Sequence, residues 1–269
     1  MGGHAAYMMG LVHRRLALVR RPSPRVGEGL VTHREREPVD AELAARQWRG
    51  YVRALQGQGW AIVEAPPADD CPDGVFVEDQ VVVYGDLAVL GRSGAPQRRA
   101  EQTGLEETMR SLGYRVERIT EPGTLDGGDV LKHDGLVWVG DAEEAPRTDA
   151  AGYAQLAELL APLGVQCRRV AVRGVLHLKS AVTALPDGTV LGWEPALPDL
   201  GAFRSFLPAD EPSGAHVVLL GGRTVLMAES APLTAEQLRR RGLDVVTVDI
   251  GELEKLDGCV TCLSVRLRG

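Results

Sequence analysis

The sequence predicts an α/β protein built from one repeated unit, a β-hairpin followed by a helix and a strand. Four pairs of apolar runs flank a tight turn, and four amphipathic stretches end at a glycine before an apolar strand. Helices that alternate with groups of strands indicate an α/β architecture, and a unit recurring every ~35 to 80 residues is typical of an array or a ring. Single strands at the two ends of the chain favour a closed ring.

The first element is a strand, LALVRR, at residues 16–21. We interpret residues 1–15 as a loose extension, because their basic pair follows the mildly apolar stretch, the wrong order for a signal peptide. No apolar run reaches the ~18 residues that a membrane span needs. We expect one domain over residues 16–269, with no membrane partner.

The predicted hairpins share turns of Gly and Asp, which supply the positive-φ positions of short loops. They are VVVYGDLAVL (81–90), VLKHDGLVWV (130–139), AVTALPDGTVLG (181–192) and HVVLLGGRTVLM (216–227). The expected turns are Gly85-Asp86, Asp134-Gly135, Asp187-Gly188 and Gly221-Gly222.

Each predicted helix carries apolar residues at helical spacing and ends at a glycine, which adopts the left-handed conformation at little cost. The helix-strand stretches are QWRGYVRALQGQGWAIVEAP (47–66), LEETMRSLGYRVERI (105–119), YAQLAELLAPLGVQCRRVAV (153–172) and TAEQLRRRGLDVVTVDI (234–250). The last is expected to open with a capping box from Thr234 to Gln237. The final strand, CLSVRLR (262–268), would pair with the first strand and remove the open edges of the ring.

The composition indicates a small cationic ligand. The net charge is −7 and the basic residues are scattered, which argues against a nucleic-acid partner. An acidic protein suits a cationic molecule. The four cysteines in 269 residues do not form a disulfide scaffold, so we expect reduced thiols and a cytoplasmic location.

Polar residues stand at the start of strands that should be apolar. They are Glu78 and Asp79 in FVEDQVVV, Asp126 and Asp129 in TLDGGDVL, His177 and Lys179 in VLHLKSAVTAL, and Cys262 in VTCLSVRL. In a radial array, equivalent positions of successive units face the same end of the central axis. We therefore expect a thiol, an imidazole and several carboxylates to converge on one pocket.

This set of side chains suits nucleophilic catalysis on a cation. A cysteine thiolate is a strong nucleophile, and histidine is its usual partner in proton transfer. A carboxylate behind the histidine fixes its tautomer and stabilises its charged form. Further carboxylates attract a cation, and a guanidinium matches paired carboxylates best.

The pair Cys259 and Cys262 has two other interpretations. Half of a zinc site would need a second Cys or His pair, and Cys71 and Cys167 stand alone, so we predict no metal. A thioredoxin-like redox pair opens a helix after a strand, whereas CVTCLSVRL runs into an apolar strand.

Five blocks, FVEDQVVV, GAPQRR, TLDGGDVL, LHLKS and DGCVTCLS, together resemble the dimethylarginine dimethylaminohydrolases, a family of the guanidino-group-modifying superfamily that includes arginine deiminases. The blocks occur in the order of the family, from about residue 17 to the last strand. The resemblance implies a five-bladed α/β propeller of hairpin-helix-strand repeats around a central pocket, and an enzyme without a cofactor.

The resemblance also implies a role for each matching residue. Cys262 would be the nucleophile, His177 the general acid and base, and Asp126 its orienting carboxylate. The expected substrate-binding residues are Glu78 and Asp79 for the guanidinium, Arg98 and Arg147 for the α-carboxylate, and Asp73 with the backbone near Leu30 for the α-amino group. Cys259 stands where the family usually has an aliphatic residue, so we interpret it as filler with some oxidation liability.

Two segments add to this interpretation. Leu30 lies in RPSPRVGEGLVTH, whose Pro- and Gly-rich composition fits a mobile lid. VWVGDAEEAPRTDAAG departs from the family pattern, because extra acidic residues precede Arg147. Arg147 is the best match for the second carboxylate-binding arginine.

The predicted reaction is hydrolysis of asymmetric dimethylarginine to citrulline and dimethylamine through a covalent thiouronium on Cys262. The alternatives are a deiminase acting on arginine, an amidinotransferase, and a guanidine-binding module without turnover. The expected partner is a small cationic guanidine, and a homodimer is possible.

Overall fold

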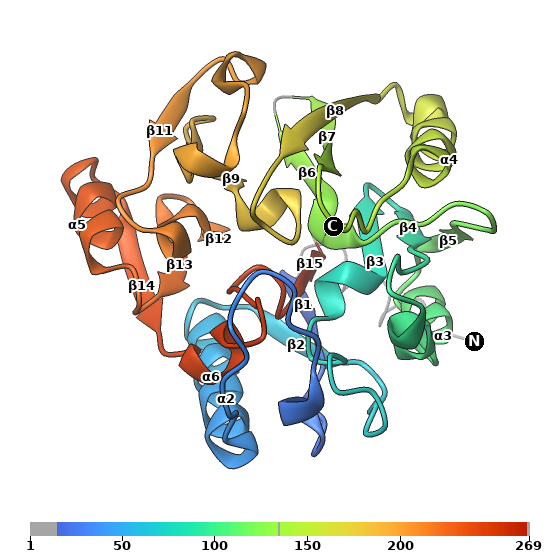
Figure 1. The fold of residues 1–269 in the computed structure, drawn as a ribbon, viewed down its shortest axis with the longest axis horizontal. Helices are drawn as coiled ribbons and strands as arrows, with labels where there is room; N and C mark the ends of the chain where they lie inside the picture. The colour runs from blue at the N-terminus through green and yellow to red at the C-terminus, as the bar shows by residue number, and fades with distance from the viewer. Residues whose placement is uncertain (1–14, 134, 268–269) are drawn as a thin grey trace, which may run out of the picture.

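Five three-stranded sheets surround a central axis, as Figure 1 shows. The structure is a computed structural model in which residues 15–133 and 135–267 are described. The predicted extension, apart from residue 15, and Asp134 of the second expected turn lie outside the described residues. In each sheet the middle strand pairs antiparallel with one neighbour and parallel with the other. The five-bladed propeller expected from the resemblance is confirmed.

The first sheet joins the two ends of the described chain. Strand β1 (Leu16–Val19) pairs antiparallel with β15 (Val265–Leu267) and parallel with β2 (Ala61–Glu64). Leu16 faces Leu267 in this register. The predicted pairing of the terminal strands is confirmed, and it gives the first blade the same make-up as the other four.

The other four sheets follow one another along the chain, and each begins with one of the predicted hairpins. Their strands are β3 (Val81–Tyr84), β4 (Leu87–Leu90) and β5 (Arg115–Arg118); β6 (Val130–His133), β7 (Leu136–Ala142) and β8 (Gln166–Val172); β9 (Val182–Ala184), β10 (Val190–Gly192) and β11 (Phe206–Pro208); β12 (Val218–Gly221), β13 (Thr224–Ala228) and β14 (Asp244–Val248). The fourth turn was predicted one residue early. An irregularity in register between Leu219 and Gly221 moves it to Gly222-Arg223.

Helices lie on the outer rim of the ring (Figure 1). They are α2 (Ala41–Gly57), α3 (Leu105–Ser111), α4 (Ala150–Leu160), α5 (Pro232–Arg240) and the short α6 (Gly251–Glu254). Gly59, Gly113, Gly164 and Gly242, predicted as stops, all have positive φ between 72° and 89°. The fourth blade has the short 3-10 turns Glu194–Ala196 and Leu200–Ala202 in place of an α-helix, because Pro195 and Pro198 lie in that segment.

The start of α5 differs from the prediction. The helix begins at Pro232, so Thr234 lies inside the first turn, and the expected capping box is wrong. The carboxylate of Glu211 accepts hydrogen bonds from the backbone N–H groups of Leu233 and Thr234. An acidic side chain distant in sequence therefore accepts hydrogen bonds from the N–H groups that the first turn of the helix leaves unpaired.

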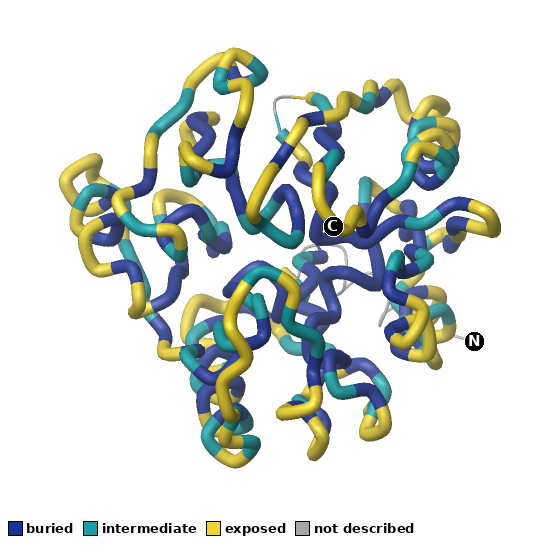
Figure 2. The backbone as a smooth tube through the Cα atoms, in the orientation of Figure 1, coloured by how far each residue is buried: buried dark blue, intermediate teal, exposed yellow. Residues whose placement is uncertain are grey.

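The hydrophobic core is divided into five clusters, each between two neighbouring sheets. Val81 and Val83 pack into the cluster between the first and second sheets, whereas Val82 packs into the cluster between the second and third sheets. This alternation follows from the period of two in a strand. Figure 2 shows buried backbone toward the ring centre and exposed backbone at the rim. Apolar side chains fill the spaces between neighbouring blades, so buried polar side chains lie nearer the central axis.

The assignment of residues 16–269 to one domain stays a prediction. No helix in the described ranges is both long and apolar enough for a membrane crossing.

Candidate active site

A small cavity lies where six of the segments singled out in the sequence meet. Its free volume is about 10 Å³, which is room for about one water molecule. Its walls are formed by Leu30, Asp73, Phe76, Asp79, Arg98, Arg147, Leu176, His177, Leu256, Asp257, Gly258 and Cys262. Seven of the nine predicted site residues line this cavity, and Asp126 contacts one of them, His177. Glu78 is bonded through its backbone N–H to the carbonyl of Cys262, but its side chain lines another cavity.

His177 and Asp126 form a hydrogen-bonded pair beside the cavity. His177 directly precedes the 3-10 turn Leu178–Ser180, and Asp126 directly precedes the turn Gly127–Asp129. Imidazole Nε2 lies 3.3 Å from Asp126 Oδ2, and Asp126 Oδ1 accepts from the backbone N–H of Gly94. Both side chains are buried, so this carboxylate fixes the orientation of the ring.

The surroundings of His177 favour its protonated form. Burial opposes the charge, but the carboxylates of Asp79, Asp129 and Asp126 raise the pKa of His177 to about 9. Imidazole Nδ1 lies 3.7 Å from Asp79 Oδ1. At neutral pH the ring is therefore an imidazolium, able to give a proton to a departing amine.

Asp129 holds the loop that carries His177. Its Oδ1 accepts from the backbone N–H of Leu178 at 3.0 Å, and its Oδ2 accepts from the hydroxyl of Thr148 at 2.6 Å. Burial raises the pKa of Asp129 to about 6. Asp129 was expected only as one of the polar residues before a strand, without a role of its own, and its position next to Gly-Gly was the available signal.

Cys262 lies in the turn that leads into β15, and its side chain reaches the cavity. Its Sγ lies 3.2 Å from Sγ of Cys259, and both thiols are buried. The contact with Cys259, burial, and the nearby Asp79 and Glu78 carboxylates raise the pKa of Cys262. These surroundings favour the neutral thiol of Cys262 over its thiolate.

Asp79 and Arg98 form a buried ion pair in the wall. Arg98 Nη1 donates to Asp79 Oδ2 at 2.7 Å, and the other side of the guanidinium binds Glu101 through two bonds of 2.9 Å. Burial opposes ionisation, but His177 and Arg98 lower the pKa of Asp79. The second oxygen, Asp79 Oδ1, has no hydrogen-bond partner among the described residues.

Asp73 and Leu30 meet at another part of the wall, as the resemblance implied. The backbone N–H of Leu30 lies 3.0 and 3.2 Å from the two carboxylate oxygens of Asp73. The following segment is held by Asp257, whose Oδ2 accepts from the backbone N–H of Thr32 and His33. The segment expected to be a lid thus borders the cavity at Leu30 and is held there by these hydrogen bonds, and its mobility stays a prediction.

Arg147 also reaches the cavity despite the extra acidic residues that precede it. Its Nη2 donates to the hydroxyl of Thr32 at 3.1 Å, whereas Nη1 is buried without a partner in the described part of the chain. Gly94 allows this approach, because a Cβ there would lie 2.4 Å from the carbonyl oxygen of Arg147. Strand β7 continues to Ala142, and the loop after it takes up the insertion.

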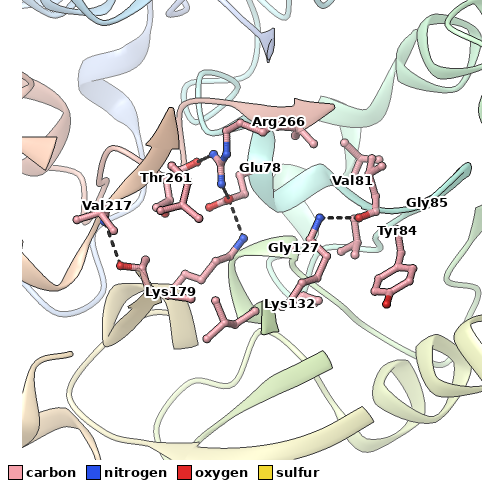
Figure 3. A pocket seen from close by; sticks show the side chains of 18 residues that line it. Glu78, Val81, Tyr84, Gly85, Gly127, Lys132, Lys179, Val217, Thr261 and Arg266 are labelled. Atoms are coloured by element: carbon pink, nitrogen blue, oxygen red, sulfur yellow. Dashed lines mark hydrogen bonds and ion pairs between the residues drawn. The ribbon is translucent and has the colours of Figure 1, made fainter. Parts of the chain in front are cut away.

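The structure separates Glu78 from Asp79. Glu78 faces a second cavity of about 290 Å³ (Figure 3). There its Oε1 lies 2.7 Å from Lys179 Nζ and 3.2 Å from Arg266 Nη2. The two acids are adjacent in the 3-10 turn Val77–Gln80, which sends their side chains in different directions. Asp79 thus lines the cavity of Cys262, and the expected role of Glu78 beside it at the guanidinium stays a prediction.

Among the described residues, one group could hold a metal ion: Asp79, Asp126 and His177. Their possible ligand atoms lie within 4.8 Å of one another. An imidazolium has no lone pair for a metal, and His177 favours that form. The trio suits proton transfer better than metal binding.

Comparisons with known proteins agree with this geometry, although no family model matches the chain. The N(G),N(G)-dimethylarginine dimethylaminohydrolase of Streptomyces coelicolor is 60 % identical over 252 residues, which cover 94 % of this chain and 96 % of the relative. The enzyme of the same name from Pseudomonas aeruginosa is 34 % identical over 253 residues, with 93 % and 98 % covered.

Solved structures show the same arrangement of the chain. The structure of DDAH from Pseudomonas aeruginosa, a Cys-to-Ser mutant complexed with citrulline, has a TM-score of 0.86 at 31 % identity and covers 95 % of this chain and 100 % of that one. The N-terminal domain of ArgZ, an arginine dihydrolase, has a TM-score of 0.77 at 19 % identity, covering 94 % and 97 %. The second likeness concerns the fold alone.

Proposed function

The chain belongs to the dimethylarginine dimethylaminohydrolase family, and from that premise we propose that its Cys262, His177 and Asp126 hydrolyse asymmetric dimethylarginine. The products are citrulline and dimethylamine. The substrate is a small guanidine, which enters the closed cavity when the segment around Leu30 moves aside.

One observation carries the assignment of the substrate to this cavity. Two buried atoms in its wall, the acceptor Asp79 Oδ1 and the donor Arg147 Nη1, have no hydrogen-bond partner among the described residues. Buried polar groups are normally satisfied, so unpaired ones indicate what a ligand supplies. An amino acid with a guanidinium at one end and a carboxylate at the other would satisfy both atoms.

The remaining polar groups fit the same orientation. The carboxylate of Asp73, beside the backbone of Leu30, would receive the α-ammonium group. Arg98 would support the α-carboxylate less than Arg147 does, because its guanidinium is already bound to Glu101 and Asp79. Arg147 is therefore the main determinant for an α-carboxylate.

In the first chemical step Cys262 attacks the guanidinium carbon. The bound cation favours the thiolate, and the proton of the thiol leaves to solvent. The S–C bond forms and the bond from carbon to the dimethylated nitrogen breaks. The His177 imidazolium gives its proton to that nitrogen, so dimethylamine departs and a thiouronium remains on Cys262.

In the second step a water molecule hydrolyses the thiouronium and displaces Cys262 from its carbon. His177, now neutral, takes a proton from a water molecule that attacks the thiouronium carbon. The C–S bond breaks, the thiolate of Cys262 is released, the second proton of the attacking water passes to solvent, and citrulline forms. Asp126 keeps the ring in one orientation through both proton transfers, since its carboxylate stays bonded to Nε2.

Turnover of three substrates tests the proposal. Asymmetric dimethylarginine, arginine and agmatine are incubated with the protein, and the ureido product of each is assayed. We expect dimethylarginine to react fastest, and agmatine slowly because it lacks the carboxylate for Arg147. Faster turnover of arginine would favour the deiminase alternative, and faster turnover of agmatine would remove the role of Arg147.

A homodimer and a cytoplasmic location complete the proposal. Both come from the sequence interpretation. Sedimentation of the purified protein tests the first, and cell fractionation tests the second.

A further inference from the structure

Two thiols lie in contact beside the cavity, and the proposed mechanism uses one of them. Sγ of Cys259 lies 3.2 Å from Sγ of Cys262 and 3.2 Å from the hydroxyl oxygen of Thr261. Both cysteines are unbonded and buried, with exposed fractions of 2 % and 5 %. No step of the proposed hydrolysis needs the second thiol.

The backbone between the two thiols has the geometry that a disulfide requires. The N–H of Cys262 donates to the carbonyl of Cys259 at 3.1 Å, the bond that closes a four-residue turn. The Cα atoms that end a β-turn lie less than about 7 Å apart, and a disulfide needs about 4.4 to 6.8 Å between its Cα atoms. Bond formation therefore requires a side-chain movement of about 1 Å and little movement of the backbone.

An oxidant that enters the cavity meets the two thiols in a fixed order. Cys262 lines the cavity, whereas Cys259 lies outside the lining and packs into the core between the first and fifth sheets. A small neutral oxidant such as hydrogen peroxide reaches Cys262 first. Cys259 is already in contact with the sulfur that would be oxidised.

We infer that Cys259 and Cys262 are a reversible oxidation site, at which a peroxide converts the nucleophile into a disulfide. The inference rests on the proposed function in so far as Cys262 is the nucleophile. The thiolate of Cys262 attacks the O–O bond, which gives a sulfenic acid and, after uptake of a proton, one water. The thiol of Cys259 then attacks that sulfur, the S–O bond breaks, and a second water leaves.

The disulfide has two consequences for the enzyme. It removes the thiolate that attacks the substrate, so the oxidised protein is inactive. It also prevents further oxidation of Cys262 to sulfinic acid, which is irreversible without a dedicated enzyme. A dithiol reductant returns both thiols, and activity returns with them.

The test compares the wild-type protein with Cys259→Ser and Cys259→Ala, with Cys167→Ser as the matched control. Each full-length protein is treated with hydrogen peroxide, then with dithiothreitol, and activity is assayed at each stage. Peptide mass spectrometry locates the oxidised sulfur. The activity of the reduced variants, compared with wild type, shows that they are folded.

We expect wild type and Cys167→Ser to lose activity with formation of a Cys259–Cys262 bond, and to recover nearly all of it on reduction. Both Cys259 variants should gain oxygen on Cys262 and recover less than about one tenth. Equal recovery by wild type and the Cys259 variants, or no bond between these sulfurs, would overturn the inference. A mapped disulfide together with full activity of Cys262→Ser would keep the oxidation site and remove the proposed mechanism.

Discussion

Residues that are close neighbours in the chain line two different cavities near the axis. Four positions supply one residue to the catalytic side and a close neighbour to the larger cavity of Figure 3. The pairs are Asp79 and Glu78, Asp126 and Gly127, His177 and Lys179, and Cys262 and Thr261. The same turns therefore build both sites.

The two sites differ in how their charges are satisfied. In the larger cavity Glu78 Oε1 is bound by Lys179 and Arg266, whereas Glu78 Oε2 is buried without a hydrogen-bond partner among the described residues. In the catalytic cavity Asp79 Oδ1 and Arg147 Nη1 lack hydrogen-bond partners among the described residues. The catalytic cavity thus leaves both a buried acceptor and a buried donor for a ligand, whereas the Glu78 carboxylate of the larger cavity already has two cations on its other oxygen.

Replacing the nucleophile should have the largest effect. Cys262→Ser puts a weakly acidic hydroxyl where the thiol attacks, so we expect kcat to fall by about 10³-fold or more. Thr261→Ser, its neighbour at the other cavity, is the matched control and should keep activity within about threefold. Steady-state assay of citrulline measures kcat of both variants. Similar losses of kcat in the two variants would contradict the assignment of catalysis to the cavity that Cys262 lines.

The adjacent acids give the most direct contrast between the cavities. Asp79→Asn should lower kcat/KM by about 10²-fold, because the guanidinium loses a charged acceptor. Glu78→Gln should change kcat/KM much less and lower the free energy of unfolding by about 3 kcal/mol, since Lys179 and Arg266 lose their buried partner. Assays and urea denaturation separate the two effects. The reverse pattern would assign the guanidinium to Glu78.

Removing the guanidinium of Arg147 should act on substrate binding. Arg147→Gln leaves the α-carboxylate without a charged partner, so KM for dimethylarginine should rise by about tenfold with little change in kcat. Turnover of agmatine, which has no carboxylate, is the internal control and should not change. An equal loss on both substrates would mean that Arg147 supports the fold of the wall instead.

The pH dependence should report the carboxylates around His177. Because the imidazolium gives the proton to the amine, kcat/KM should fall above pH of about 9, the pKa of His177. Asp126→Asn removes one of the acids that raise this pKa and should move the alkaline limb to lower pH. A limb at an unchanged pH would assign it to another group.

The same shift affects stability in a defined direction. The folded-state pKa of His177, about 9, lies above the ordinary value of 6.5. The protonated form is therefore favoured by the fold, and this contribution is complete below pH of about 6.5 and lost as pH rises to about 9. Urea denaturation of wild type and His177→Gln over this range should show a decline only in wild type.

The smallest effect is expected at Cys259 under reducing conditions. Cys259→Ser should retain most of kcat, because the side chain lies outside the cavity lining. Removing its contact should lower the pKa of Cys262, so alkylation of Cys262 by iodoacetamide should reach half its maximal rate at a lower pH. An unchanged profile would show that the contact does not affect ionisation.

Much of the fold follows from local sequence. Glycines with positive φ set the ends of helices, and the alternating valines of β3 follow from the period of two in a strand. The start of α5 could not be predicted, because the group that caps it, Glu211, lies about twenty residues earlier in the chain. Local patterns carry local geometry, whereas caps from distant segments need the tertiary structure.

The candidate site shows the same division. The convergence of Cys262, His177 and Asp79 follows from equivalent positions in successive blades. The separation of Glu78 from Asp79 depends on the direction of each side chain in one 3-10 turn, which adjacency in sequence does not encode. The contact of Cys259 with Cys262 likewise required the turn between them.

Acid-quenched turnover of dimethylarginine provides the decisive measurement. The chain is digested after the quench, and fragmentation of the peptide that contains both Cys259 and Cys262 locates the covalent adduct. We predict a thiouronium on Cys262 that appears and decays at the rate of citrulline formation. An adduct on Cys259, or turnover without any adduct on Cys262, would contradict the mechanism.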